Sequence, residues 1–299
     1  MVEQNLTRNI SNFINELKKK EKREEFGYSF AEGKNILISC LQKNIPLKYI
    51  VLDKTKKELF NDILKKVDNS IIYWTDEQNL LKISSTKTSY FCITVFKTPD
   101  IIENVDLNTI KAIDNRNSSL FNEIERFLDR EKFISAFLQI SDPGNLGTII
   151  RTSIGFNQTK IILFESHCDL FSPKVIRSSS GAIFSLEKII NISENLEEIF
   201  LNKIKNIKLK IGYAEKSINE NNIIGDIEFY KNSQRFLPLL VLYGNEGKGI
   251  PERLQDIKDF SISIPQSNNI ESYNLSISHA IITYSLYQQT KLQIIAKKS

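Results

Sequence analysis

The feature that most restricts the fold is an alternation of short apolar runs with helical patterns that begins at Lys132. Runs of strand length occur at FISAFLQI, KIILFE, KLKIGYAE, FLPLLVLYG and DFSISIPQ. The helical pattern LGTIIRTSIGF separates the first run from the second, and SPKVIRSSSGAIFSL separates the second from the third. Strands that alternate with helices predict an α/β domain built on a parallel sheet. The last pattern, SYNLSISHAIITYSLYQQTKL, predicts a terminal amphipathic helix.

A smaller α/β unit is predicted before it. LKYIVLD, SIIYW and SYFCITVFK have the composition of buried strands, and a helix over Leu6–Leu17 is expected to continue through the charged run KKKEKREE. Residues 98–131 are polar and rich in Asn and Asp, which is typical of a domain boundary. We therefore expect an N-terminal domain over residues 1–103, a connector over 104–131 and a second domain over 132–299.

Composition excludes several classes of protein. Three scattered cysteines without a C-x-x-C pair argue against a disulfide framework or a structural zinc site, and two histidines are too few for a histidine-based metal centre. The longest apolar runs, such as LPLLVLY, are too short to cross a membrane, and the first residues lack a signal or transit pattern. We expect a cytoplasmic protein that binds neither metal nor membrane. The net charge of +4 permits nucleic-acid binding without predicting it.

Polar clusters follow three of the predicted strands: DPGNLGTIIR, YGNEGKGIP and IPQSNNIESYNLSISHA. The carboxyl ends of strands are where open α/β sheets bind ligands. GNEGKG lacks the spacing of a P-loop, PGNLG lacks the dinucleotide-binding signature, and no serine lies in a Gly-x-Ser-x-Gly elbow. The sequence therefore predicts one ligand site built from three loops.

Together these loops resemble the three signature motifs of the SpoU/TrmH group of RNA 2′-O-ribose methyltransferases, in the SPOUT superfamily. The matching residues are N-L-G-T-I-I-R, G-N-E-G-K-G-I and I-P…S-Y-N-L-S. The resemblance implies a parallel sheet with a trefoil knot, S-adenosylmethionine as cofactor, an RNA substrate, and a homodimer formed through the C-terminal domain. The segment KREEFGYSFAEGKNILISCL resembles an RNA-binding domain of the L30e/L7Ae type, which is similar to the accessory domains of rRNA-modifying members more than of tRNA-modifying ones.

The resemblance also implies roles for individual residues. The cofactor contacts would be Gly244, Ile264 and Tyr273, and the catalytic residues Asn145, Arg151, Glu246, Ser272 and Asn274. A glycine without Cβ lets the backbone approach a ligand closely. The family proposal makes the arginine of the first motif a general base, but a guanidinium stays protonated in proteins, so Arg151 is equally a candidate clamp for a phosphate or oxyanion.

Two positions depart from the family pattern, and a histidine lies in the predicted terminal helix. The family usually has glycine at Asn268 and leucine at Tyr273. Asparagine tolerates a positive φ, and a tyrosine there could stack on the adenine or narrow the pocket. His279 is expected to pack or cap within the terminal helix.

The leading hypothesis is an S-adenosylmethionine-dependent enzyme that methylates a ribose 2′-hydroxyl, in rRNA rather than tRNA. Three alternatives stay open: a tRNA 2′-O-methyltransferase, a methyltransferase acting on a base, and a non-catalytic RNA-binding or ribosome-assembly protein. The N-terminal domain would recognise RNA by shape and exposed bases. The run from Lys18 to Arg23 is expected to be a solvated helix end, with an RNA contact as the alternative, and Lys34 is a second candidate phosphate contact.

Overall fold

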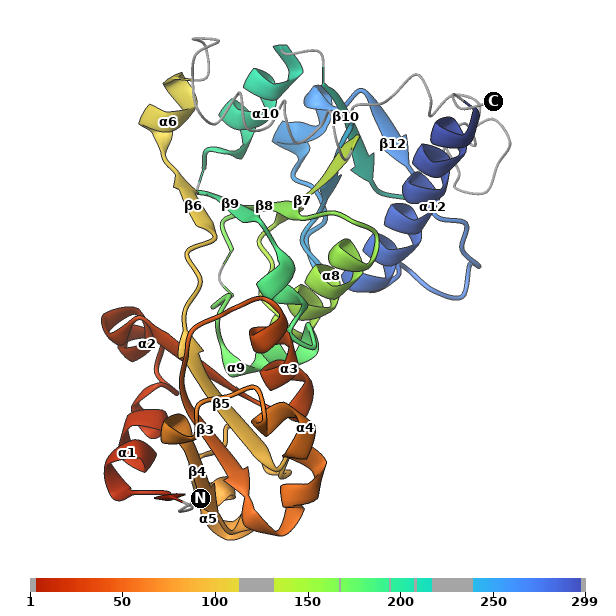
Figure 1. Cartoon of the computed structure of the whole chain (residues 1–299). Helices are drawn as coiled ribbons and strands as arrows, with labels where there is room; N and C mark the ends of the chain where they lie inside the picture. The colour runs from red at the N-terminus through yellow and green to blue at the C-terminus, as the bar shows by residue number, and fades with distance from the viewer. Residues whose placement is uncertain are drawn as a thin grey trace. The chain divides into compact units, whose positions relative to one another are not determined.

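The computed structural model describes residues 4–112, 132–166, 168–193, 195–206, 209–216 and 239–296. They fall into two compact units (Figure 1). The first comprises Met1–Asp100, Leu146–Arg151 and Asp169–Ser185, and the second comprises Ile101–Asn145, Thr152–Cys168 and Leu186–Ser299. Each unit has its own sheet and its own hydrophobic core.

The first unit contains a mixed sheet of five strands. Their order is β1 (Gln4–Asn5), β4 (Ile72–Thr75), β3 (Leu47–Asp53), β5 (Cys92–Lys97) and β2 (Tyr28–Glu32). β5 runs antiparallel to both of its neighbours. The helical elements are α1 (Arg8–Glu16), α2 (Lys20–Phe26), α3 (Lys34–Gln42), α4 (Asn61–Leu64), α5 (Glu77–Ile83) and α9 (Pro173–Ser178), with 3-10 turns at η1 (Lys54–Phe60), η2 (Asn69–Ile71) and η3 (Ala182–Ser185).

The charged run near the N-terminus does not continue the first helix. Thr7 caps α1 by accepting a hydrogen bond from the amide of Ile10 at 3.4 Å, and α1 ends at Glu16, with Leu17 as its C-cap, before α2 begins. Arg23 is 5% exposed, donates to the carbonyl of Leu17 at 2.6 Å and forms an ion pair with Asp169. Both expectations for Arg23, a solvated helix end and a phosphate contact, are therefore wrong, because a buried acceptor and a carboxylate engage its guanidinium.

The second unit is built on a seven-stranded sheet in which every pair of neighbours is parallel. The order is β12 (Phe260–Ile262), β10 (Lys210–Ala214), β11 (Leu239–Tyr243), β7 (Phe133–Leu138), β8 (Lys160–Phe164), β9 (Lys188–Ile192) and β6 (Ile102–Val105). The helical elements are α6 (Leu107–Ala112), α10 (Glu197–Asn206), η4 (Glu252–Ile257) and α12 (Leu275–Ala296), and α8 (Pro143–Gly155) has residues in both units. The predicted α/β class, with a parallel sheet and a smaller N-terminal α/β region, is confirmed.

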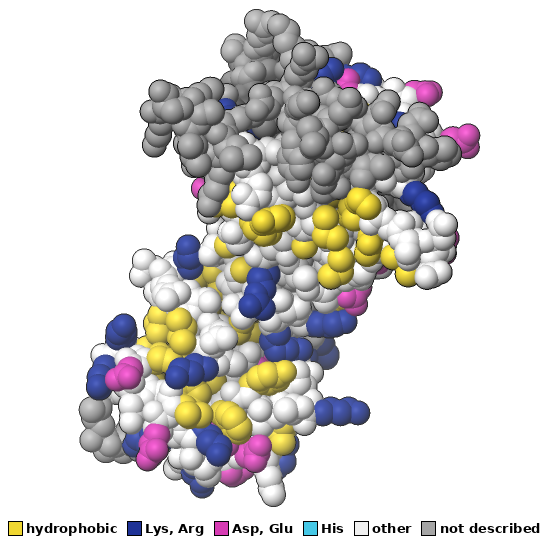
Figure 2. Space-filling view, turned by 90° about the vertical axis from the view of Figure 1, so that its right-hand side faces the viewer, with side chains coloured by type: hydrophobic (Ala, Val, Ile, Leu, Met, Phe, Trp, Pro, Cys, Tyr) yellow, Lys and Arg dark blue, Asp and Glu magenta, His cyan; other side chains and the backbone are white. Residues whose placement is uncertain are grey.

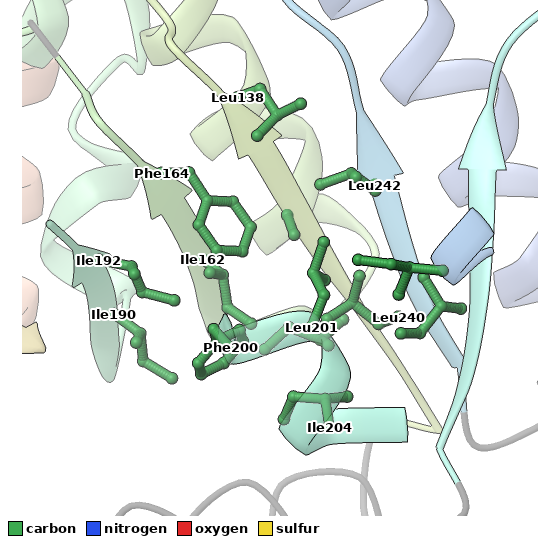
Figure 3. Close-up of a cluster of buried hydrophobic side chains, with 14 of the residues drawn as sticks. Leu138, Ile162, Phe164, Ile190, Ile192, Phe200, Leu201, Ile204, Leu240 and Leu242 are labelled. Atoms are coloured by element: carbon green, nitrogen blue, oxygen red, sulfur yellow. The ribbon is translucent and has the colours of Figure 1, made fainter. Parts of the chain in front are cut away.

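Alternate residues of the central strands face two different layers. Ile134, Ala136 and Leu138 of β7 and Leu240 and Leu242 of β11 belong to a core that also contains Phe200, Leu201 and Ile204 of α10 (Figure 3). The residues between them, such as Phe137 and Tyr243, contact His279 of α12 on the opposite face. Period-two alternation thus gives each strand two buried faces, as expected of a parallel sheet covered on both sides.

Several elements differ from those predicted. β6 (Ile102–Val105) pairs with β9 and forms an edge strand of the second sheet. Its residues are assigned from the sequence partly to the N-terminal domain and partly to the connector. Residues 113–131 of the connector lie outside the described residues. The helix expected over 172–186 ends at Ser178, because Ser180 and Gly181 adopt φ of 53° and 80°. The domain boundaries, the knot and the L30e-like assignment stay predictions.

Candidate active site

A cavity lies at the carboxyl ends of β10, β11 and β12 and has a volume of about 870 Å³. Seven of the eight residues selected from the sequence line it: Asn145, Gly244, Glu246, Ile264, Ser272, Tyr273 and Asn274. Apolar side chains, including Ile250, Leu275 and Ile282, line it as well. The three polar clusters, far apart in the chain, therefore converge on one concave site.

The loop after β11 is closed by its own hydrogen bonds. Asn245 and Gly249 exchange backbone hydrogen bonds of 3.0 and 2.9 Å, and the Asn245 side chain accepts from the amides of Gly247 and Lys248 at 3.0 and 3.1 Å. A Cβ on Gly244 would lie 2.5 Å from the carbonyl carbon of Gly249. Glycine is therefore needed at position 244 because the loop folds back on itself, and the expected close approach to a ligand stays a prediction.

Asn245 is a site residue that the motif interpretation missed. Its side-chain amide donates to the carbonyl of Gln139 at 3.0 Å, which ties the loop after β11 to the end of β7. An Asn just before a Gly-rich turn is itself a turn signal, because its side chain can accept from the amides that follow. That signal was present in YGNEGKG.

The N-terminus of α8 places Asn145 at the cavity. Asp142 caps the helix by accepting from the amide of Asn145 at 2.8 Å, and Pro143 occupies the first turn, where its missing N–H has no cost. Gly147 lies one turn after Pro143, on the side of α8 that packs closely against Val175. A Cβ at this position would lie 2.7 Å from the carbonyl oxygen of Val175. Asn145 itself is half-buried.

The loop before α12 supplies the third wall. Asn274 caps this helix, since its side-chain oxygen accepts from the amide and hydroxyl of Ser276 at 2.9 and 2.7 Å. The Tyr273 hydroxyl donates to the carbonyl of Pro265 at 3.1 Å, so it braces the loop instead of pointing free into the cavity. Asn268 has no positive φ, so the conformational tolerance invoked for it is not used.

A chain of hydrogen bonds joins the three segments. The Asn274 amide donates to Oδ1 of Asn145 at 3.1 Å, and the Asn145 amide donates to the carboxylate of Glu246. These partners are 129 and 101 residues apart in the sequence. Both the oxygen and the nitrogen of the Asn145 side chain are thereby fixed, and among the described residues its second N–H has no acceptor.

Arg151 is the one selected residue that does not line the cavity. Its side chain is exposed on α8, and within the described ranges it makes no hydrogen bond or ion pair. Four charged residues that the motif interpretation did not select do line the cavity: Glu215 and Lys216 beyond the end of β10, and Lys248 and Glu271 in the other two loops. Glu215 accepts from Ser261 at 2.5 Å and pairs with Lys258, so its carboxylate is engaged in holding β12.

Among the residues that the structure describes, no group of three or more His, Cys, Asp or Glu side chains could hold a metal ion. In the same residues no helix combines the length and apolar character needed to span a bilayer.

Comparison with known proteins identifies the family. Residues 132–284 match the SpoU rRNA Methylase family. The chain belongs to this family. The match confirms the resemblance drawn from the three motifs, and a SpoU-family chain with this site is an RNA methyltransferase.

Relatives of the SpoU chain extend over most of its length. An uncharacterized tRNA/rRNA methyltransferase of Borreliella burgdorferi is 31% identical over 186 residues, which are 61% of this chain and 75% of the relative. The crystal structure of an RNA 2′-O ribose methyltransferase, 20% identical, matches with a TM-score of 0.72. The match covers 97% of this chain and 99% of the chain in that structure. An AdoMet-bound rRNA methyltransferase of Sinorhizobium meliloti, 21% identical, has a TM-score of 0.66, with 95% and 96% covered. At these identities the two structures show that the fold is shared.

Proposed function

We propose that this SpoU-family protein transfers the methyl group of S-adenosylmethionine to a ribose 2′-hydroxyl of rRNA in the cytoplasm. The observation that carries the proposal is the hydrogen-bonded series Asn274–Asn145–Glu246 at the wall of the cavity. A protein that only bound RNA would have no need for three polar groups from three loops to be aligned beside a cavity of cofactor size.

The cavity fits the cofactor. Its volume, about 870 Å³, lies within the range of about 300–1,000 Å³ that is usual for small-molecule sites. The backbone of the loops after β11 and β12, with Ile264 and Tyr273, offers the mix of apolar surface and peptide groups that an adenosine needs. Gly244, Ile264 and Tyr273 would hold the cofactor, whose sulfonium supplies an activated methyl group when bound.

The protein's own residues would align the ribose and manage its charge. The second N–H of Asn145 can donate to the 2′-oxygen or to a neighbouring phosphate, while Glu246 and Asn274 keep its amide in one orientation. Ser272, exposed at the cavity edge, would help position the RNA. Arg151 would act on the substrate as a base or as a clamp. Alignment of reacting groups is the main contribution required, because the donor is already activated.

Tritium transfer from labelled S-adenosylmethionine to rRNA and tRNA tests the activity and its substrate. Alkaline hydrolysis then identifies the position, since a 2′-O-methyl group blocks strand cleavage and a base methyl group does not. We expect alkali-resistant label in rRNA and its loss with Arg151→Ala. Label in tRNA, alkali-sensitive label, or no transfer by the folded protein would establish one of the alternatives instead.

Asn145→Asp tests the hydrogen-bonded series directly. It would place two carboxylates against each other, and we expect transfer to fall about a hundredfold, the usual consequence of a misplacement of about 1 Å. Adding Glu246→Gln should recover part of the rate, because the amide and carboxylate then exchange places. Asn191→Asp is the matched control. The side-chain amide of Asn191, on β9, donates to the side chain of Asn104 at 2.8 Å, and Asn191 does not line the cavity. Equal loss in the single and double variants would refute this use of Asn145.

A homodimer is the assembly that we propose, through α12. Ile277 and Tyr284 of this helix are 48% and 50% exposed, and they lie seven positions apart, on one stripe. The ring of Phe156 lies 5.8 Å from that of Tyr284, so the apolar surface extends beyond α12. Figure 2, viewed from the side of α12, shows hydrophobic side chains gathered there. Tyr284→Glu should convert a dimer to a monomer in light scattering, and a monomeric wild-type protein would refute the assembly.

A further inference from the structure

A histidine outside the three selected loops lies buried beneath the cavity. His279, on the second turn of α12, has no exposed surface. Its ring packs edge-on against Phe137 of β7 and Tyr243 of β11, with centroids 5.2 and 5.4 Å away, and these two rings stack on each other at 4.8 Å. Three aromatic rings from three elements thus form one cluster in the second unit.

The cluster is polar in a way that packing alone does not explain. The Nε2 atom of His279 lies 3.4 Å from the hydroxyl of Ser153 on α8, while Nδ1 has no partner among the described residues. The hydroxyl of Tyr243 is buried as well, beside the hydroxyls of Thr283 and Ser135. Burial lowers the pKa of His279 to about 3, so the imidazole stays neutral at physiological pH. Buried polar atoms without partners destabilise a fold, and apolar residues of similar volume would avoid this.

The place of His279 relates it to each wall of the cavity. Tyr243 directly precedes Gly244 and lines the cavity floor. Ser153 lies on α8, two turns after Asn145. His279 itself follows the cap Asn274 by five positions and is flanked by Ser278, which lines the cavity. One side chain therefore contacts the strand or helix that carries each of the three loops.

We propose that His279 is a positioning residue of the methyltransferase site, which fixes the first turns of α12 against α8 and β11 through its bond to Ser153 and its two ring contacts. The inference rests on the proposed function, because the geometry that it maintains is that of Asn145, Glu246 and Asn274. In this role the hydrogen bond sets the rotation of α12 about its axis, which apolar packing between smooth rings does not specify.

Four variants of the full-length protein test the proposal. His279→Phe keeps the ring contacts and removes the hydrogen bond, His279→Gln keeps an amide close to the position of Nε2, and Ser153→Ala removes the partner. The control is Gln289→Leu, because Gln289 is also a buried polar residue of α12 without a partner among the described residues, but it lies ten positions further along the helix from the cavity. Calorimetry measures binding of S-adenosylmethionine, thermal unfolding measures stability, and tritium transfer measures kcat and KM.

We expect His279→Phe to unfold at or above the wild-type temperature, yet to bind S-adenosylmethionine about tenfold more weakly and to lose on the order of tenfold to a hundredfold in kcat. His279→Gln should recover part of both losses. Ser153→Ala should resemble His279→Phe, and adding Ser153→Ala to His279→Phe should cause little further loss. Gln289→Leu should match wild type in binding and rate. Wild-type binding and kcat in folded His279→Phe would overturn the proposal, as would equal losses in Gln289→Leu. If His279→Phe does not fold, Ser153→Ala decides in the same way. A wild-type protein without methyl transfer would instead refute the proposed function, and cofactor binding would still test His279.

Discussion

Acid should destabilise the wild-type chain more than it destabilises His279→Phe. The pKa of His279 is lowered by burial from 6.5 to about 3 in the folded protein. The unfolded chain therefore takes up a proton near pH 6.5 that the folded chain refuses until about pH 3. The stability that the neutral imidazole retains is complete above pH 6.5 and is lost as the pH falls through that window. At pH 5 the loss amounts to about 2 kcal/mol relative to pH 8.

Urea unfolding followed by circular dichroism at pH 8 and pH 5 measures this difference. The carboxylates titrate alike in both proteins. The difference in free energy of unfolding between wild type and His279→Phe therefore changes with pH only through His279. We expect this difference to move by about 2 kcal/mol in favour of His279→Phe at pH 5. NMR titration of the imidazole gives an independent check, with no protonation midpoint expected above pH 4. A difference that is the same at both pH values, or a midpoint near 6.5, would refute the reasoning.

Two further predictions concern backbone space and a buried charge. Gly244→Ala should weaken S-adenosylmethionine binding in calorimetry, because its Cβ would lie 2.5 Å from the carbonyl carbon of Gly249, whereas Gly155→Ala, with nothing within 4 Å, should leave binding unchanged. Glu32→Gln should lower the free energy of unfolding by about 1–3 kcal/mol in urea at pH 7, because it removes the charge with which the buried Glu32 pairs with the partly exposed Arg177. Burial alone would raise the pKa of Glu32, but hydrogen bonds and the Arg177 charge lower it below the ordinary value of 4.5, so this stability should be complete above that value and be lost as the pH falls below it.

The central strands of both sheets could be predicted because they are buried on both faces and therefore form continuous apolar runs. β6 could not, because IENV is a mixed edge strand whose Glu103 pairs with Lys188 at 2.7 Å. Its partner β9 was missed with it, since KIINI lies in a region of polar residues. An edge strand takes its identity from its neighbour more than from its composition.

The site was predictable where its residue types are constrained by a motif, and not where they depend on tertiary partners. Asn145 and Asn274 belong to recognisable loops, so they could be selected without knowledge of their separation in space. Arg23 could not be judged from its charged neighbours, because the carboxylate that buries its charge, Asp169, lies far away in the chain. His279 was expected to pack within the terminal helix and it does, but its contacts with β7, β11 and α8 follow only from the fold.

The distribution of burial around the cavity implies a division of labour between rigid and exposed groups. His279, Tyr243 and Ser153 lie in the interior, whereas Glu246, Ser272 and Asn274 at the cavity are exposed. Exposed charges are screened by water, and they gain strength only when a ligand excludes that water. Under the proposed function, the interior groups would hold the loops in place before the RNA arrives, and the exposed groups would contribute electrostatically only once RNA covers the cavity. On this reasoning the RNA completes the active site, and selection of the substrate and acceleration of methyl transfer depend on the same docking event.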